Sequence, residues 1–291
     1  MNTDFFYKTL QDVKSYGRKA TSRGLETLEI LDYKYNLPPY ARFMCFDHRK
    51  LKLDYIKQEF MWYLLGEPKD VSICRLASMW KGLINEDGTI NSNYGYYIFN
   101  PKTGIDGVSN FDRVVNTLTQ DPQSRRAVMM ILNSEHLNSE TKDYPCTVYI
   151  NYLIRDGKLH QFVRMRSQDA IFGMGNDAPF FSMLMELMYW TLVRGGMNDL
   201  QLGTYHHSAD SFHVYEKHYK MLDQILADPV VSDDFHERCP VMSPLTPISL
   251  KLLRDNRQWS MDELKKLSGD VFTAWLLERD DEATLVMPEV A

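Results

Sequence analysis

Two stretches of the chain carry apolar residues at the three- and four-residue spacing of a helix. Residues 52–65 gather such residues on one face, and Gly66 follows where a C-terminal helix cap belongs. Residues 179–194 are apolar over most of their length and end at Gly195-Gly196. We therefore predict one amphipathic helix and one long, largely buried helix.

Alternating patterns elsewhere predict strands. Residues 148–154 and 159–165 flank the sequence Arg155-Asp156-Gly157-Lys158, and its Asp-Gly pair favours a tight hairpin. A further helix is expected after Ser211, and Ser260-Met261-Asp262-Glu263 matches a capping box at the start of another. Helices and strands mix without regular βαβ alternation, which predicts an α+β fold with a mixed β-sheet flanked by helices.

Length and composition predict one soluble domain. The 291 residues are 44% hydrophobic, which is enough to bury a substantial core. They contain no internal repeat, low-complexity tract or flexible linker, so we expect a single domain over residues 1–291. No apolar run approaches the ~20 residues that span a bilayer, and the N-terminus lacks the apolar core of a signal peptide. We expect a cytoplasmic protein that does not bind membranes.

Charge and cysteine usage narrow the function. A formal net charge of −6 disfavours nucleic acid as a partner, because duplex binding needs a basic stripe. A mononucleotide remains open, since a few local arginines can hold one phosphate. The four cysteines show no CxxC spacing, which predicts free thiols and no metal site. His206-His207 also lacks a carboxylate or cysteine at ligand spacing, so no metal is expected there.

Two residues are candidates for covalent and acid–base chemistry. Cys146 directly precedes the first strand of the hairpin, and Arg166 ends the second strand, so an arginine could lower the pKa of the thiol. The alternative is a cysteine that packs as a small hydrophobe. Glu59 shares the apolar face of residues 52–65, where desolvation would raise its pKa towards neutrality. An exposed helix acid is the alternative for Glu59, but the apolar neighbours oppose it.

Asp177 has two interpretations. It precedes Ala178-Pro179 at the expected start of the long helix, and aspartate before such a proline is a common N-cap. A carboxylate also accepts hydrogen bonds from a base that offers donors, as the exocyclic amine of cytosine does. From the residues alone, both interpretations stay open.

Several motifs in consecutive order resemble the thymidylate synthase family. The match runs from about residue 9 to about residue 222, and residues 225–291 form a C-terminal extension whose role the resemblance does not give. The matching segments are Ser22-Arg23-Gly24, Glu59 to Gly66, Asn93-Tyr94-Gly95, Ser124-Arg125-Arg126, Pro145-Cys146, Arg166 to Gly173, and His213 to His218. This resemblance implies a thymidylate synthase-like fold and a homodimer formed through the sheet.

The departures from the family pattern point to one branch of it. Asp177 stands where the family normally has the asparagine that reads uracil, as in the bacteriophage deoxycytidylate hydroxymethylases that the chain most resembles. Thr147, Met165 and Ser211 also differ from the histidine, glutamine and aspartate of thymidylate synthases. The resemblance therefore moves the expected substrate from dUMP towards dCMP.

The resemblance also implies a role for each matching residue. Four arginines and one serine would hold the phosphate, with Arg125 and Arg126 entering the neighbouring subunit's site: Arg23, Arg125, Arg126, Arg166 and Ser167. Asp169 would belong to the network that links the folate to the active site. His213 and Tyr215 would bind the sugar hydroxyl. Trp80 and Tyr94 would line the binding sites of the folate and the base. Taken alone, these residues are equally explained as surface charges, turn residues or core packing.

The activity implied is hydroxymethylation of dCMP with 5,10-methylenetetrahydrofolate and water. Cys146 would add to the pyrimidine, Glu59 would manage proton transfers, and Asp177 would stabilise the adduct. The alternatives are a dUMP methylase or hydroxymethylase, a CMP hydroxymethylase, and a non-catalytic nucleotide-binding protein. Residues 287–291 would either close over the folate or form a tail. A phage origin would place the protein in host cytoplasm.

Overall fold

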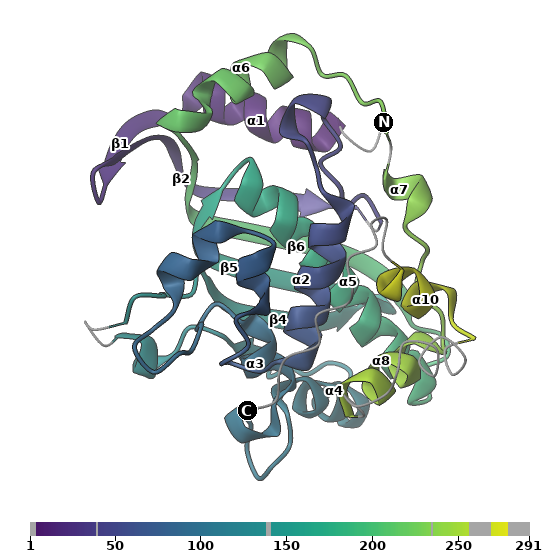
Figure 1. The fold of residues 1–291 in the computed structure, drawn as a ribbon. Helices are drawn as coiled ribbons and strands as arrows, with labels where there is room; N and C mark the ends of the chain where they lie inside the picture. The colour runs from purple at the N-terminus through teal and green to yellow at the C-terminus, as the bar shows by residue number, and fades with distance from the viewer. Residues whose placement is uncertain (1–3, 39, 138–140, 234, 256–268, 279–291) are drawn as a thin grey trace.

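A six-stranded mixed sheet forms the framework of the protein (Figure 1). The computed structural model describes residues 4–38, 40–137, 141–233, 235–255 and 269–278. The strand order is β1-β2-β6-β5-β4-β3. The strands are β1 (Arg18–Ser22), β2 (Leu25–Leu37), β3 (Val128–Met130), β4 (Thr147–Arg155), β5 (Lys158–Asp169) and β6 (Gln201–Tyr215).

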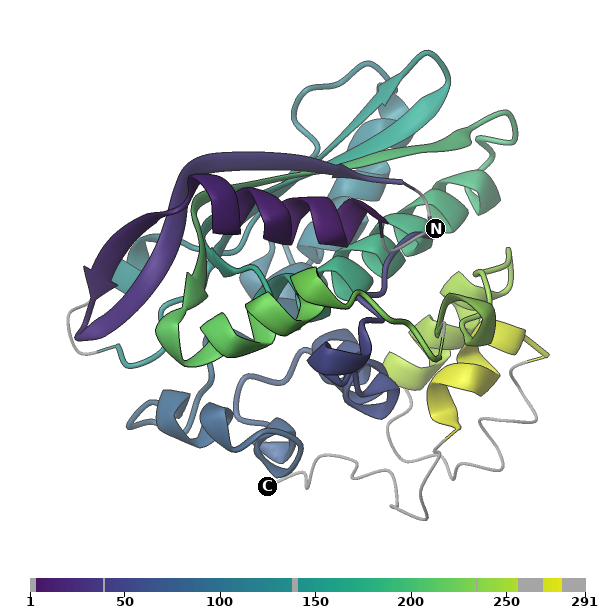
Figure 2. The same ribbon diagram turned by 90° about the horizontal axis from the view of Figure 1, so that it is seen from above.

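Helices cover one side of this sheet, as the view from above shows (Figure 2). The helix α5 crosses from β5 to β6, which form the parallel pair; a parallel pair needs such a crossover. The described helices are α1 (Asp4–Tyr16), α2 (Leu53–Leu65), α3 (Tyr94–Phe99), α4 (Asn110–Gln120), α5 (Phe172–Arg194), α6 (Tyr219–Ala227), α7 (Phe235–Arg238), α8 (Thr246–Asp255) and α10 (Val271–Leu277). The predicted α+β fold with a mixed sheet is confirmed.

Local sequence signals placed α2 and the hairpin correctly. Gly66 ends α2 with a left-handed φ of 57°, and its N–H donates to Trp62 O. A Cβ at this glycine would lie 2.7 Å from Gly95 O, so α3 can pack closely only against a glycine. Asp156 and Gly157 both have positive φ, 51° and 69°, between the paired residues of β4 and β5. This matches the primed turn that Asp-Gly favours.

The predicted start of the long helix is wrong. The helix α5 begins at Phe172 and carries Pro179 in its interior. Its start is fixed by Asp169, whose carboxylate accepts the backbone N–H groups of Ile171 (3.0 Å) and Phe172 (3.3 Å). Asp177 therefore lies within the helix, and its interpretation as an N-cap is also wrong.

The helix expected after Ser211 is a strand instead. Ser211 pairs with Leu31 on β2 and with Ser167 on β5, and β6 continues to Tyr215. Cross-strand pairing on both sides decides this segment, which local sequence does not show. The next α-helix, α6, begins at Tyr219. The capping-box sequence 260–263 lies outside the described residues.

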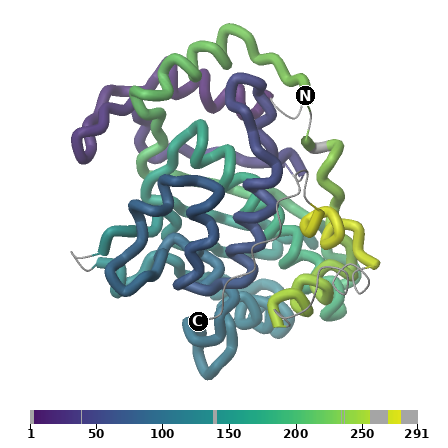
Figure 3. The backbone as a smooth tube through the Cα atoms, in the orientation of Figure 1, coloured from purple at the N-terminus to yellow at the C-terminus, as the bar shows by residue number. Residues whose placement is uncertain are grey.

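The helices α8 and α10 lie on the helical side of the sheet, where α8 packs against α5 and α10 packs against α2 (Figure 3). A buried carboxylate on α5, that of Glu186, connects the C-terminal part of the chain to the core. Arg42 donates to Glu186 Oε2 on α5 at 2.7 Å, and the side chains are 3% and 1% exposed. Glu186 Oε1 also accepts the backbone N–H of Met242 at 2.5 Å. One carboxylate thus joins three segments that are distant in sequence.

We expect Glu186→Ala to lower the free energy of unfolding by about 3–5 kcal/mol, because it leaves the Arg42 guanidinium buried without its counter-charge. Urea denaturation measures this loss. Asp223→Ala, which breaks the exposed pair with Lys14, is the matched control and should change the stability by less than about 1 kcal/mol. Equal effects of the two substitutions would contradict the structural importance of the buried pair.

Candidate active site

Three candidate residues from different elements share one electrostatic environment. Cys146 directly precedes β4, and its carbonyl accepts the backbone N–H of Arg166 on β5 at 2.8 Å. The charge of Asp177 on α5 acts on the Cys146 thiol, and it also acts on Glu59 of α2. The fold therefore brings the predicted nucleophile, acid–base group and base reader together.

The expected lowering of the Cys146 pKa is wrong. Burial raises the pKa of the thiol and outweighs the opposing effect of the Arg166 guanidinium. Arg166 is itself engaged, because it donates to Pro145 O (3.0 Å) and Tyr144 O (2.7 Å) and lies 4.8 Å from the centre of the Tyr144 ring. The thiol form therefore predominates at neutral pH, and a proton acceptor is needed to generate the thiolate.

The predicted burial of Glu59 and its raised pKa are confirmed. Its side chain lies in the core, and burial raises its pKa to about 8. The Tyr55 hydroxyl donates to Glu59 Oε1 at 2.7 Å and accepts the indole N–H of Trp80 at 3.1 Å. Trp80 lies in the 3-10 helix η3 (Ser78–Leu83), buried against Trp62. A carboxyl with this pKa exchanges protons readily near neutrality.

Asp177 is a second acid of the same site, and its side chain is half-buried. Burial raises its pKa to about 7, while a hydrogen bond from Gln168 Nε2 at 2.9 Å opposes this rise. Asp169, which caps α5, adds to the rise through its negative charge. Both protonation states of Asp177 are therefore populated at neutral pH.

The other predicted residues fall into two groups. Arg23, at the exposed turn between β1 and β2, has a φ of 50°, and its charge acts on Cys146 and Tyr215. The Tyr215 ring lies 4.8 Å from that of His213, and Asp169 acts electrostatically on both residues. These residues therefore border the site. His213 lies on β6, so its expected place on a helix is wrong.

Tyr94 also lies in the site, while two arginines lie apart from it. The Tyr94 ring is buried and stacks on Tyr63, and the charges of Cys146 and Asp177 act on its hydroxyl. Arg125 and Arg126 are exposed in the loop before β3, and none of the described contacts joins them to Cys146. Ser167 is half-buried on β5.

Arg49 is a site residue that the sequence did not reveal. It is 4% exposed, donates to Asn176 Oδ1 at 2.6 Å, and lies 5.3 Å from the centre of the Phe172 ring. Its charge lowers the pKa of Glu59. The glycine at position 175, inside a helix, was the sequence signal for a close neighbour, because a Cβ there would lie 2.8 Å from the Arg49 guanidinium.

The described residues contain no group of three or more His, Cys, Asp or Glu that could hold a metal ion. Over the same residues, no helix is both long and apolar enough to cross a membrane. The site offers a thiol, one buried and one half-buried acid, and aromatic side chains that line it. This set suits covalent and acid–base chemistry on a flat polar ring.

Comparison with known proteins defines the class. The family model for thymidylate synthase matches residues 4–232, and the chain belongs to this family. It is 29% identical to the deoxycytidylate 5-hydroxymethyltransferase of Enterobacteria phage T4, over 69% of the chain and 80% of that protein. It is 27% identical to the deoxyuridylate hydroxymethyltransferase of Bacillus phage SP01, over 96% of the chain and 74% of that protein. It is also 24% identical to a thymidylate synthase of Vesicomyosocius okutanii, over 75% of the chain and 80% of that protein.

The raised pKa of Glu59 predicts a pH-dependent stability. The folded protein holds this proton more tightly than the unfolded chain, so the contribution is full below pH 4.5 and is lost as pH rises through about 8. In the wild type, ionisation of Glu59 should lower the unfolding free energy by at most about 5 kcal/mol as pH rises. Glu59→Gln should abolish this decrease. Urea denaturation between pH 5 and pH 9 measures it.

Glu86→Gln, at an exposed position, is the matched control and should retain the pH dependence of the wild type. If Glu59→Gln also retained that dependence, Glu59 would not be a desolvated acid in the folded protein.

Proposed function

We propose that the protein converts dCMP to 5-hydroxymethyl-dCMP, with 5,10-methylenetetrahydrofolate as co-substrate and water as the final nucleophile. The observation that carries this proposal is Asp177, a half-buried acid that shares the environment of Cys146 and Glu59. One oxygen of a protonated carboxyl group there can accept a hydrogen bond from the exocyclic amine of cytosine. The other oxygen can donate its proton to cytosine N3, which carries no hydrogen. The similarity to a phage deoxycytidylate 5-hydroxymethyltransferase supports the same substrate.

The chain's own residues would carry the steps as follows. Glu59, whose pKa is about 8, accepts and returns protons, including those displaced when the Cys146 thiol becomes a thiolate. Cys146 Sγ then forms a bond to carbon 6 of the pyrimidine, which makes carbon 5 nucleophilic. Glu59 accepts the proton that carbon 5 loses as the bond between the newly attached carbon and tetrahydrofolate breaks. Water then adds its oxygen to that carbon, and the bond from Cys146 Sγ to carbon 6 finally breaks to release the product. Asp177 holds the base and shares a proton with it throughout.

Methylenetetrahydrofolate, when bound, supplies the one-carbon unit that carbon 5 receives. The residues present fit such a ligand. Trp80 provides an aromatic side chain one hydrogen bond from Tyr55 and two from Glu59. Arg49 Nε is a buried donor without a hydrogen-bond partner among the described residues, and Tyr94 adds an aromatic wall beside Cys146 and Asp177.

The phosphate would be held by Arg23, Arg166 and Ser167, with Arg125 and Arg126 supplied by a partner subunit. Guanidinium groups suit this task because they stay charged and pair with phosphate oxygens in bidentate fashion. His213 and Tyr215, side by side on β6, would bind the sugar hydroxyl.

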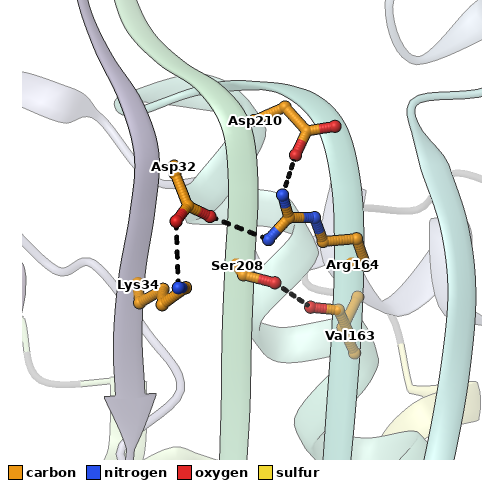
Figure 4. Close-up of polar contacts among 6 residues, drawn as sticks. All are labelled: Asp32, Lys34, Val163, Arg164, Ser208 and Asp210. Carbon is orange, nitrogen blue, oxygen red and sulfur yellow. Dashed lines mark hydrogen bonds and ion pairs between the residues drawn. The ribbon is translucent and has the colours of Figure 1, made fainter.

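We also propose a homodimer through the open side of the sheet. Arg164 on β5 bonds to Asp32 on β2 at 2.9 Å and to Asp210 on β6, and Lys34 contacts Asp32 at 2.9 Å (Figure 4). Leu31, on the same sheet, is 72% exposed. A second copy would cover this surface and bring its Arg125 and Arg126 towards Cys146.

A second candidate is hydroxymethylation of dUMP, which the similarity to a phage deoxyuridylate hydroxymethyltransferase favours. Incubation with methylenetetrahydrofolate and dCMP, dUMP or CMP separately, followed by mass spectrometry of the nucleotide, distinguishes them. A hydroxymethyl mass increase on dCMP alone is expected. Reaction on dUMP alone would assign the second candidate, a methyl product would contradict water as nucleophile, and binding without turnover would indicate a nucleotide-binding protein.

Asp177→Asn should shift the ratio of kcat/KM values for dCMP and dUMP towards dUMP by roughly 100-fold, because an amide can face uracil with a donor and an acceptor. Steady-state kinetics on both nucleotides measure the ratio. Asp223→Asn, an exposed position on α6, should leave the ratio unchanged. An unaltered preference for dCMP in Asp177→Asn would remove Asp177 as the base reader.

Shared arginines predict complementation between inactive variants. Cys146→Ser and the double variant Arg125→Ala, Arg126→Ala should each lose turnover. Mixed subunits should regain about a quarter of wild-type activity, because half of the dimers are mixed and each holds one complete site. An inactive mixture, with exchange of subunits verified by native mass spectrometry, would contradict arginine sharing.

A further inference from the structure

A chain of buried hydrogen bonds leads from Asp177 away from the site. Gln168 on β5 donates from Nε2 to Asp177 Oδ2 at 2.9 Å and accepts, at Oε1, the hydroxyl of Tyr35 on β2 at 3.2 Å. Gln168 and Tyr35 are 2% and 6% exposed. None of the steps proposed above uses either residue.

The chain continues to a histidine in the core. The Tyr35 hydroxyl also forms a hydrogen bond with the Tyr205 hydroxyl on β6. The Tyr205 hydroxyl in turn lies 2.5 Å from His207 Nδ1. The His207 ring stacks on Tyr35, and burial lowers its pKa to about 3, so the imidazole is neutral. His207 Nε2 is buried without a hydrogen-bond partner among the described residues.

This unpaired nitrogen sets the direction of the whole chain. If His207 carries its proton on Nδ1, it donates to Tyr205, Tyr205 donates to Tyr35, and Tyr35 donates to Gln168 Oε1. The reverse direction would place the proton on Nε2 and leave a buried N–H without an acceptor. Native structures avoid an unpaired buried donor more strictly than an unpaired acceptor. The Gln168 amide is therefore held with its NH2 group towards Asp177.

A fixed amide distinguishes the two oxygens of Asp177. Because Oδ2 accepts the Gln168 donor, the proton of the neutral acid belongs on Oδ1. Cytosine presents an acceptor at N3 and a donor at N4, while uracil presents a donor at N3 and an acceptor at O4. The two bases therefore need the carboxyl proton on opposite oxygens. A carboxyl group free to exchange its proton between oxygens would serve both.

We propose that Gln168, oriented by Tyr35, is a specificity-determining positioning residue: with Asp177 Oδ1 towards ring position 3 of the base, it keeps the proton of the acid on Oδ1 and so favours cytosine over uracil. This inference rests on the proposed function, because it assumes that Asp177 reads the base. Gln168 touches Asp177 and not the reacting carbons, so it acts through the acid.

A second buried tyrosine–glutamine pair provides a matched control. Tyr152 on β4 donates to Gln161 Oε1 on β5 at 2.7 Å, and Gln161 donates to Phe181 O at 2.9 Å. Both residues are fully buried in the same sheet. Tyr35→Phe and Tyr152→Phe each remove one hydroxyl hydrogen bond to a buried glutamine, but only Tyr35 is linked to Asp177.

The test compares kcat/KM for dCMP and dUMP in the wild type, Tyr35→Phe and Tyr152→Phe, with the unfolding free energy of each. We expect Tyr35→Phe to reduce the preference for dCMP by about tenfold, the value of one hydrogen bond. Tyr152→Phe should lose similar stability and keep the wild-type preference. Gln168→Leu should reproduce the Tyr35→Phe result.

The outcomes separate the two proposals. If the wild type prefers dCMP but Tyr35→Phe keeps this preference, the positioning role of Gln168 is overturned and the proposed function stands. If Tyr152→Phe loses the preference equally, a general packing effect replaces the positioning role. A wild type without any preference for dCMP overturns both proposals.

Discussion

Desolvation of two carboxyl groups is the constraint on which the site depends. The helices α2 and α5 place the buried Glu59 and the half-buried Asp177 on the helical side of the sheet, where each side chain receives one hydrogen bond from the described residues. An ionised carboxylate is costly in such surroundings, so both groups hold their protons to near-neutral pH. The same burial keeps Cys146 a thiol. Proton exchange at neutral pH follows directly from this burial.

The sheet contributes more than a scaffold to this arrangement. The central strands β2, β5 and β6 pack a largely apolar core, yet they hold a connected set of polar groups behind Asp177: Gln168, Tyr35, Tyr205 and His207. A buried polar network is tolerated when its members bond to one another, and it then specifies one arrangement. The hydrogen bonds thus link the orientation of a site carboxyl group to the pairing of the strands.

The sequence predicted those parts of the fold that local chemistry decides. Apolar spacing and Gly66 sufficed for α2, Asp156-Gly157 sufficed for the hairpin, and the apolar neighbours of Glu59 revealed its burial. Tertiary contacts decided the rest. Pairing on both sides made a strand of the segment around Ser211, and Asp169 started α5 earlier than Pro179 suggested. Motif order identified the family, but no local signal joined Tyr35 to residues 130 or more positions away.

The most direct test of the central claim is a carbon-13 NMR titration of the Asp177 carboxyl group in the ligand-free protein, with Asp177→Asn to assign the signal. The account predicts a midpoint near pH 7. A desolvated acid of that kind can hold a proton for the base at neutral pH. A midpoint close to the ordinary aspartate value of 3.8, in a folded protein, would contradict the claim.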